Sequence, residues 1–168
     1  NAFVKLLVTR INTRFGALMA TWGIGIALFI DDYLNSITAG AAMRRITDHY
    51  KVSREMLAYV IDSTAVPISV LIPLSTWGVF FASVLESSGA APDGGGMTAY
   101  ISGIPYMLYP WLAVIIVPLV AKGSIPLFGP MKAAEARAAS GGGCVPPGAE
   151  HVQKANQAVN EKEDLDTS

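Results

Sequence analysis

Three long apolar stretches, each interrupted by acidic residues or prolines, constrain the fold of this 168-residue chain more than any other feature. They run over residues 15–43, 56–86 and 97–121. A helix crosses the roughly 30 Å hydrocarbon core of a bilayer with about 20 residues. The first two stretches are longer than that, so we expect each to contain a break, a re-entrant turn or a steep tilt.

The composition favours an integral membrane protein. Only 15% of the residues are charged, 52% are hydrophobic and the mean hydropathy is +0.43, whereas soluble domains carry about 25% charged residues. A net charge of −1 provides no electrostatic footprint for nucleic acid. The single cysteine, Cys144, excludes an internal disulfide and a multi-cysteine metal site. The predicted fold class is therefore all-α integral membrane, with broken or re-entrant transmembrane helices as in the core of a secondary transporter.

The predicted breaks have local causes. Gly23, Gly25 and Gly40 loosen the first stretch, and prolines remove backbone donors from the second. Ser53 is the predicted N-cap of a helix that begins near Arg54. The expected organisation begins with a connecting segment over 1–14, a broken membrane segment over 15–43 and a basic loop over 44–55. A broken span over 56–86, an external loop over 87–96 and a transmembrane helix over 97–121 follow. The remaining residues, 122–168, are expected to form a largely disordered tail in which 132–139 can form a short helix.

The loops indicate an orientation. The basic loop, residues 44–55, contains four Lys/Arg, whereas residues 86–96 contain none. The positive-inside rule then places the basic loop and the tail in the cytoplasm, and the Gly-rich loop outside, in a multi-pass protein of the cell membrane. Because Lys5, Arg10 and Arg14 precede the first stretch, both its ends look cytoplasmic. It is either a re-entrant hairpin or a broken span that violates the charge rule, and we predict the broken span.

Acidic and hydroxyl side chains lie deep inside the apolar stretches. Ionising a carboxylate such as Asp31 or Asp32 near a bilayer centre costs at least a few kcal/mol, and adjacent like charges disfavour simultaneous ionisation. Such a pair is tolerated when a cation, a proton or water reaches it, which describes an ion or proton site. The candidate ion- and proton-binding residues are Asp31, Asp32, Asn35, Asp62, Ser63 and Thr64, with Tyr33, Thr38, Ser75 and Thr76 as secondary candidates.

The same residues also have purely structural interpretations. Asp31 and Asp32 are able to cap a helix at an interface, and Asp62 is able to pair with an arginine of the basic loop. Hydroxyl groups in membrane helices most often bond to the preceding turn or to a neighbouring helix. The tryptophans are more often interface anchors or packing residues than substrate platforms.

A family resemblance is carried by Phe29-Ile30-Asp31-Asp32-Tyr33-Leu34-Asn35, Gly40, Met43-Arg44, Thr47-Asp48, Ser53-Arg54-Glu55, Leu57-Ala58-Tyr59, Asp62-Ser63-Thr64-Ala65, Pro67, Pro73 and Ser75-Thr76-Trp77-Gly78. This pattern resembles the NhaC-type Na⁺/H⁺ antiporter family, which includes malate–lactate exchangers driven by Na⁺ and H⁺. The resemblance covers roughly residues 29–78. Two positions depart from it: Arg45 stands where the family pattern has Pro, and Val66 where it has Ala.

The resemblance implies exchange of cytoplasmic Na⁺ for external H⁺ by alternating access, without a cofactor and without enzymatic chemistry. Asp32 and Asp62 are the expected titrating carboxylates that hold Na⁺, with Asp31 next in rank. The expected neutral ligands are Asn35, Ser63 and Thr64, and Arg44 is expected to hold its loop at the membrane. Family members have more spans than the three found here, and this chain does not begin with Met, so we expect a C-terminal fragment that lacks part of the transport core.

Other functions remain open from the residues alone. A Na⁺/H⁺-coupled carboxylate or amino-acid exchanger needs a group that holds a small organic anion, and helix N-termini can supply it. An intramembrane Mg²⁺-dependent transferase uses paired carboxylates with a nearby Asn, but it needs a second acid-rich motif. A purely structural membrane subunit is disfavoured by the buried acids. A homo-oligomer is also left open, and the expected surroundings are the lipid bilayer.

Overall fold

The structure is a computed structural model that describes residues 11–149. Within this range all regular structure is helical, so the all-α part of the predicted fold class is confirmed. The helices are α2 (Arg14–Ala27), α3 (Asp32–His49), α4 (Arg54–Leu71), α5 (Thr76–Ser87), α6 (Gly96–Gly103), the 3₁₀ helix η1 (Ile104–Tyr106), α7 (Leu108–Lys122) and α8 (Gly129–Ala139).

Four of these helices begin at a polar residue whose side chain accepts a hydrogen bond from the first turn. Thr13, Asp31, Ser53 and Ser75 accept from the amides of Gly16, Leu34, Met56 and Gly78, at 2.9–3.1 Å. Each bond satisfies one of the orphan N–H groups at a helix start. The predicted N-cap at Ser53, with a helix beginning at Arg54, is confirmed.

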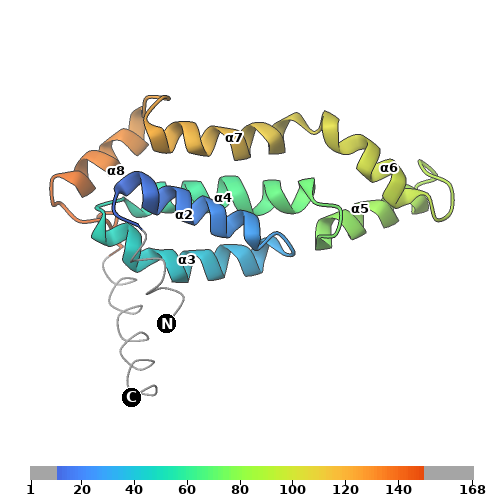
Figure 1. The fold of residues 1–168 in the computed structure, drawn as a ribbon, viewed down its shortest axis with the longest axis horizontal. Coiled ribbons are helices and arrows are strands. Elements are labelled where there is room, and N and C mark those ends of the chain that lie inside the picture. Colours follow the sequence, from blue (N-terminus) through green and yellow to red (C-terminus); the bar gives the residue numbers. More distant parts are fainter. Residues whose placement is uncertain (1–10, 150–168) are drawn as a thin grey trace, which may run out of the picture.

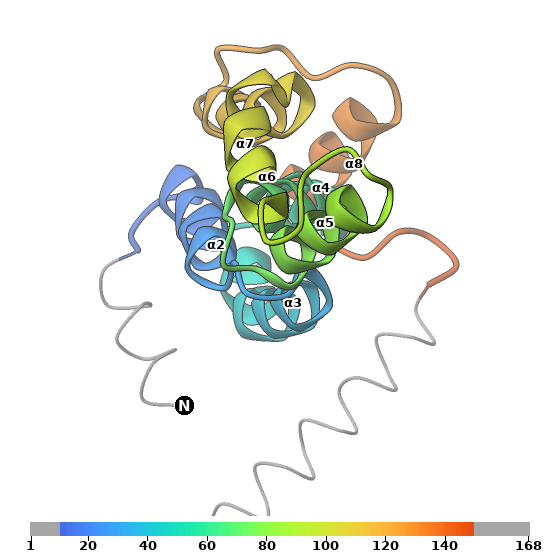
Figure 2. The same ribbon diagram turned by 90° about the vertical axis from the view of Figure 1, so that its right-hand side faces the viewer.

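Two bent rods run the length of the molecule in opposite directions (Figure 1). One is α4–α5, bent by 47°, and the other is α6–α7, bent by 51°. The shorter hairpin α2–α3 packs against the α4 half of the first rod, and α8 lies at the same end as the start of α4 (Figure 1). The end-on view shows α4 near the centre, where it contacts α2, α3, α5, α7 and α8 (Figure 2).

The buried core belongs to the half of the molecule that contains α2, α3, α4 and α7. One cluster gathers Ile11, Ala17, Met43, Ile46 and Leu57, and a second gathers Leu18, Val52, Met56, Val60 and Val117. Pro118 lies inside α7 and has no N–H for the carbonyl of Val114, which instead accepts a 3.0 Å hydrogen bond from the indole of Trp22. Trp22 therefore joins α2 to α7 at a helix defect.

Residues 11–149 contain two bent helix pairs with the length and composition of a membrane span. No single helix there combines the length and the apolar character needed to cross a bilayer alone, whereas the bent pairs α4–α5 and α6–α7 do so by length and composition.

The first apolar stretch differs from the broken span that we predicted. The chain reverses at residues 28–31, so α2 and α3 form a hairpin (Figure 1). The two ends of the hairpin are tied together, because the Tyr50 hydroxyl after α3 donates to the Ile11 carbonyl before α2. The predicted cause of the break was also wrong: Gly23, Gly25 and Gly40 lie within helices, and the break falls where Asp31 starts a new helix.

The third stretch is not one continuous helix. It bends at Met107, between η1 and α7. Pro110 has no N–H for the carbonyl of Tyr106, so a helix restarts at Leu108 with Pro110 in its first turn, where the donor is dispensable.

The region after α7 is more ordered than the predicted tail. The helix α8 buries Ala134, Glu135 and Ala138, and Nη2 of Arg137 donates to both carboxylate oxygens of Glu55 of α4 at 2.9 Å. These contacts explain why a segment of low hydrophobicity packs here. Residues 1–10 and 150–168, which include parts of the predicted connecting segment and tail, lie outside the described residues.

Candidate functional site

The breaks of the first two stretches lie side by side. The amide of Thr76, at the start of α5, donates to the carbonyl of Ile30 at 2.9 Å. The indole of Trp77 donates to Oδ1 of Asp32, at the start of α3, at 3.1 Å. The N-termini of α3 and α5 therefore meet at one junction, which we call the break junction and define by residues 28–35 and 72–78.

The two acidic residues at this junction, Asp31 and Asp32, make different contacts. Asp31 caps α3, because its Oδ1 accepts from the amide of Leu34 at 2.9 Å, as its structural interpretation predicted. Asp32 lies in the first turn of α3, where the helix dipole favours a negative charge. Both side chains are only partly exposed. Asp32 uses one oxygen for Trp77, which leaves the other available to a cation or a proton.

Asn35 is fully buried, and the two polar atoms of its side chain differ in their hydrogen bonding. Its Nδ2 donates to the carbonyl of Gly25 at 2.6 Å, which satisfies a backbone acceptor at the C-terminal end of α2. Its Oδ1 has no hydrogen-bond partner in the structure. A buried acceptor without a donor costs about 1–3 kcal/mol, so this oxygen is suited to a cation or a water molecule. Asp32 and Asn35 are three residues apart in α3 and share one helix face.

Thr64 joins this group from α4. Its hydroxyl donates to the carbonyl of Val60 at 2.6 Å, within its own helix. A Cβ added to Gly25 would lie 2.9 Å from Cγ2 of Thr64 and 3.8 Å from Oδ1 of Asn35. The absence of a side chain at Gly25 therefore lets α2, α3 and α4 approach one another at this point.

Asp62 is not brought to the break junction. It lies on the exposed stripe of α4 with Ala58 and Val66, and positions two residues apart on a helix differ by about 200°. Asp62 consequently faces nearly away from Thr64. Within residues 11–149 it forms no ion pair, so the predicted pairing with an arginine of the basic loop is absent there. Ser63 is half-buried on α4.

Of the secondary candidates, one is buried at the break junction and others are exposed. Tyr33 and Thr38 are exposed on α3. Ser75 is buried at the junction, where its hydroxyl caps α5 and donates to the carbonyl of Ser69, whose usual donor would be the missing N–H of Pro73. A Cβ on Gly78 would lie 2.3 Å from the carbonyl oxygen of Pro73, so only glycine fits beside this break.

Sequence reasoning missed two members of the site. The carbonyl of Gly25 serves Asn35, and Trp77, interpreted as an anchor or packing residue, binds Asp32. Nothing in the sequence marks either contact, because both depend on how the helices pack. Among the described residues, no group of three or more His, Cys, Asp or Glu is placed to hold a metal ion.

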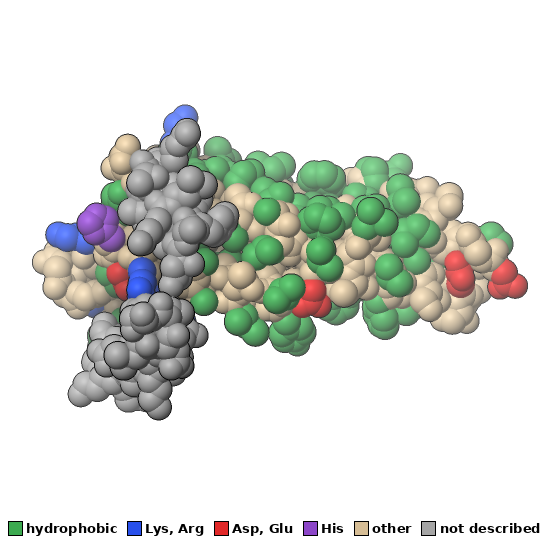
Figure 3. Space-filling model, turned by 60° about the horizontal axis from the view of Figure 1, so that its bottom comes forward, with side chains coloured by type: hydrophobic (Ala, Val, Ile, Leu, Met, Phe, Trp, Pro, Cys, Tyr) green, Lys and Arg blue, Asp and Glu red, His purple; other side chains and the backbone are tan. Residues whose placement is uncertain are grey.

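Charge is distributed unevenly along the molecule. The face in Figure 3 shows hydrophobic side chains over the middle and Lys, Arg and His at one end, while acidic groups lie beside these cations, near the centre and at the opposite end. At the cationic end, Arg54 pairs with Asp48 at 2.6 Å. Burial raises the pKa of Asp48, and the charges of Arg54 and Arg44 oppose that shift. Burial likewise lowers the pKa of Arg54, against the attraction of Asp48.

Comparison with known proteins assigns no family. No protein-family model and no solved structure matches the chain. A segment of 84 residues is 42% identical to an uncharacterized protein of Haemophilus influenzae. The match covers 50% of this chain and only 16% of that protein.

Proposed function

We propose that this chain forms part of the transport core of a secondary antiporter that exchanges Na⁺ for H⁺ by alternating access. The observation that carries the proposal is the break junction, where the Asp32 carboxylate and the partnerless, buried Oδ1 of Asn35 share one face of α3. Exposed hydrophobic side chains lie at the junction and beside it, namely Leu74 in the break itself, Ile37 on α3, and Val79 and Phe80 on α5. A charge in such surroundings marks an ion or proton site.

The chemistry follows from the oxygens present. Hard cations prefer carboxylate, amide and carbonyl oxygens, and discontinuous helices place such groups in the middle of transporters. A single carboxylate at Asp32 binds either Na⁺ or a proton. That competition couples the two fluxes, since loading one ion requires release of the other.

The two carboxylates that we predicted to titrate, Asp32 and Asp62, lie in different surroundings. Asp32 lies at the junction of two breaks, whereas Asp62 is exposed on the outer face of α4. We therefore propose Asp32 as the principal exchanging group and Asp62 as an accessory one.

One observation favours a second candidate, a Na⁺/H⁺-coupled exchanger of organic acids. The N-termini of α3 and α5 both lie at the break junction, and their dipoles attract an anion. Such a carrier would respond to Na⁺ only when a small carboxylate is supplied.

The proposal is tested with the full-length protein in liposomes carrying a pH gradient. Addition of Na⁺, but not choline, is expected to dissipate the gradient. Asp32→Asn should abolish this response and Asp62→Asn should weaken it, while Asp93→Asn, in the exposed loop at the far end, serves as the matched control and should leave it unchanged. A response that appears only with added malate or lactate would select the organic-acid exchanger. Exchange that survives Asp32→Asn would refute the site.

A further inference from the structure

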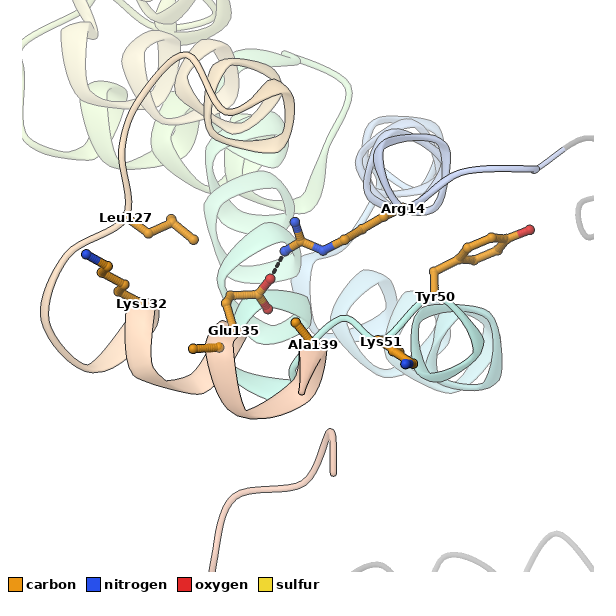
Figure 4. A pocket seen from close by; sticks show the side chains of 8 residues that line it. Arg14, Tyr50, Lys51, Leu127, Lys132, Glu135 and Ala139 are labelled. Atoms are coloured by element: carbon orange, nitrogen blue, oxygen red, sulfur yellow. Dashed lines mark ion pairs between the residues drawn. The ribbon is translucent and has the colours of Figure 1, made fainter. Parts of the chain in front are cut away.

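An open pocket of about 530 Å³ lies at the cationic end of the molecule, away from the break junction. It is formed between the start of α2, the end of α3, and α8 with the segment before it (Figure 4). Three cationic side chains line it, namely Arg14, Lys51 and Lys132. In Figure 4 the ion pair of Arg14 with Glu135 lies in the middle of the view, with Lys132 on one side and Lys51 on the other.

The pocket carries an excess of positive charge. Among residues 11–149, Glu135 is the one acidic residue that lines the pocket, and both of its oxygens are occupied, one by Arg14 and the other by the amide of Ser53 at 2.9 Å. Neither Lys51 nor Lys132 forms an ion pair within residues 11–149. Lys51 has a φ of 53°, a left-handed conformation that is uncommon for a residue with a side chain. Two cations therefore remain for a bound anion.

The remaining surface is apolar. Leu127, Ala136 and Ala139 line the pocket beside the charged residues. A free inorganic anion would gain nothing from these side chains. A ligand that combines a phosphate with acyl chains would contact both the lysines and the apolar side chains of the lining.

We propose that this pocket binds the headgroup of an anionic phospholipid, with Lys51 and Lys132 flanking the headgroup from opposite sides. This inference rests on the membrane placement of the proposed function and not on ion exchange. Basic residues near the cytoplasmic leaflet contribute about 1 kcal/mol each to binding anionic lipid, which corresponds to about fivefold in affinity per lysine.

The test uses the purified full-length protein in a neutral detergent, without Na⁺ or a pH gradient, so it is independent of transport. Phosphatidylglycerol, phosphatidylcholine and inorganic phosphate are titrated separately, and bound lipid is read by native mass spectrometry together with the melting temperature. We expect phosphatidylglycerol to bind and raise the melting temperature, and the other two compounds to have little effect.

The double variant Lys51→Asn/Lys132→Gln should weaken phosphatidylglycerol binding roughly thirtyfold. Asn is chosen at position 51 because it tolerates a left-handed backbone. Lys122→Gln, at the end of α7 and outside the pocket lining, is the matched control and should bind as the wild type does. Equal binding by the double variant, equal binding of phosphatidylcholine, or an equal effect of inorganic phosphate would each overturn the proposal.

Discussion

Asn35 shows how one side chain connects local structure to a site. Its amide nitrogen completes the C-terminal end of α2, and its carbonyl oxygen is left buried without a donor. The sequence predicted Asn35 as a ligand from its position near two acids. It could not predict the bond to Gly25, which exists only because the chain reverses between α2 and α3. The same limit applies to Asp32, whose indole partner is 45 residues away.

Replacing Asn35 by alanine should destabilise the protein. The substitution leaves the Gly25 carbonyl without its donor and opens a small cavity, while removal of the unpartnered Oδ1 offsets part of that cost, so we expect a net loss of about 1 kcal/mol in the free energy of unfolding. Thr38→Ala, at an exposed position of the same helix, should change stability by less than about 0.5 kcal/mol. The measurement is thermal unfolding of both variants in detergent. Equal stability of the two variants would contradict the role assigned to Asn35.

Cys144 provides a test of the electrostatics at the cationic end. Burial and the nearby charge of Asp48 raise the pKa of the Cys144 thiol, against the smaller opposing effects of Arg54 and Arg137. At pH 8 the reactive thiolate is therefore scarcer than in free cysteine, and alkylation by iodoacetamide should be slower. Asp48→Asn removes the negative charge and should accelerate the reaction. A rate at pH 8 equal to that of free cysteine would contradict this prediction.

At the scale of helices, the N-cap at Ser53 and the proline break of the second stretch were predictable, whereas the cause of the break in the first stretch was not. Ser53 was identified because a small polar residue followed by Arg-Glu before an apolar run is a local pattern. Glycines in apolar helices have two uses, flexibility and close packing, and sequence alone does not distinguish them. Gly25 serves packing, since an added Cβ would lie 2.9 Å from Cγ2 of Thr64. The hairpin of α2–α3 likewise depends on contacts between distant residues, such as Tyr50 with Ile11.

The close approach of α2 to α4 predicts a specific rescue. Gly25→Ala places a methyl group against Thr64 and should destabilise the protein by about 1–3 kcal/mol. Thr64→Ser removes the Cγ2 methyl, so the double variant Gly25→Ala/Thr64→Ser should recover part of that loss. A double-mutant cycle from thermal unfolding measures the coupling. Simple additivity of the two changes would show that the helices do not touch here.

At the scale of the molecule, Lys and Arg gather at one end of the long axis, and hydrophobic side chains cover the middle (Figure 3). All Lys and Arg of the described residues lie in segments at or beside the cationic end, in the starts of α2 and α4, the end of α3, the end of α7, and α8. The Gly-rich loop between α5 and α6 lies at the opposite end (Figure 1). The sequence predicted this polarity because it follows from the order of loops and apolar stretches. The bend in the third stretch and the packing of α8 were not predicted, since they arise from prolines and ion pairs acting between helices.

This polarity predicts that the two ends of the molecule lie on opposite sides of a membrane. In intact cells, a membrane-impermeant maleimide should label a cysteine at position 93, made as Asp93→Cys in a Cys144→Ser background. The native Cys144 should be labelled only after the membrane is opened. Labelling of both positions from the same side would contradict the proposed placement.

The most direct measurement is proton release from the full-length protein when Na⁺ is added in weakly buffered detergent solution. If Asp32 is the group for which Na⁺ and protons compete, Na⁺ should release protons and choline should not. The Asp32→Asn variant should lose most of that release, and Asp62→Asn should retain more of it. Proton release that is absent in the wild type, or unchanged by Asp32→Asn, would contradict a shared cation and proton site at the break junction.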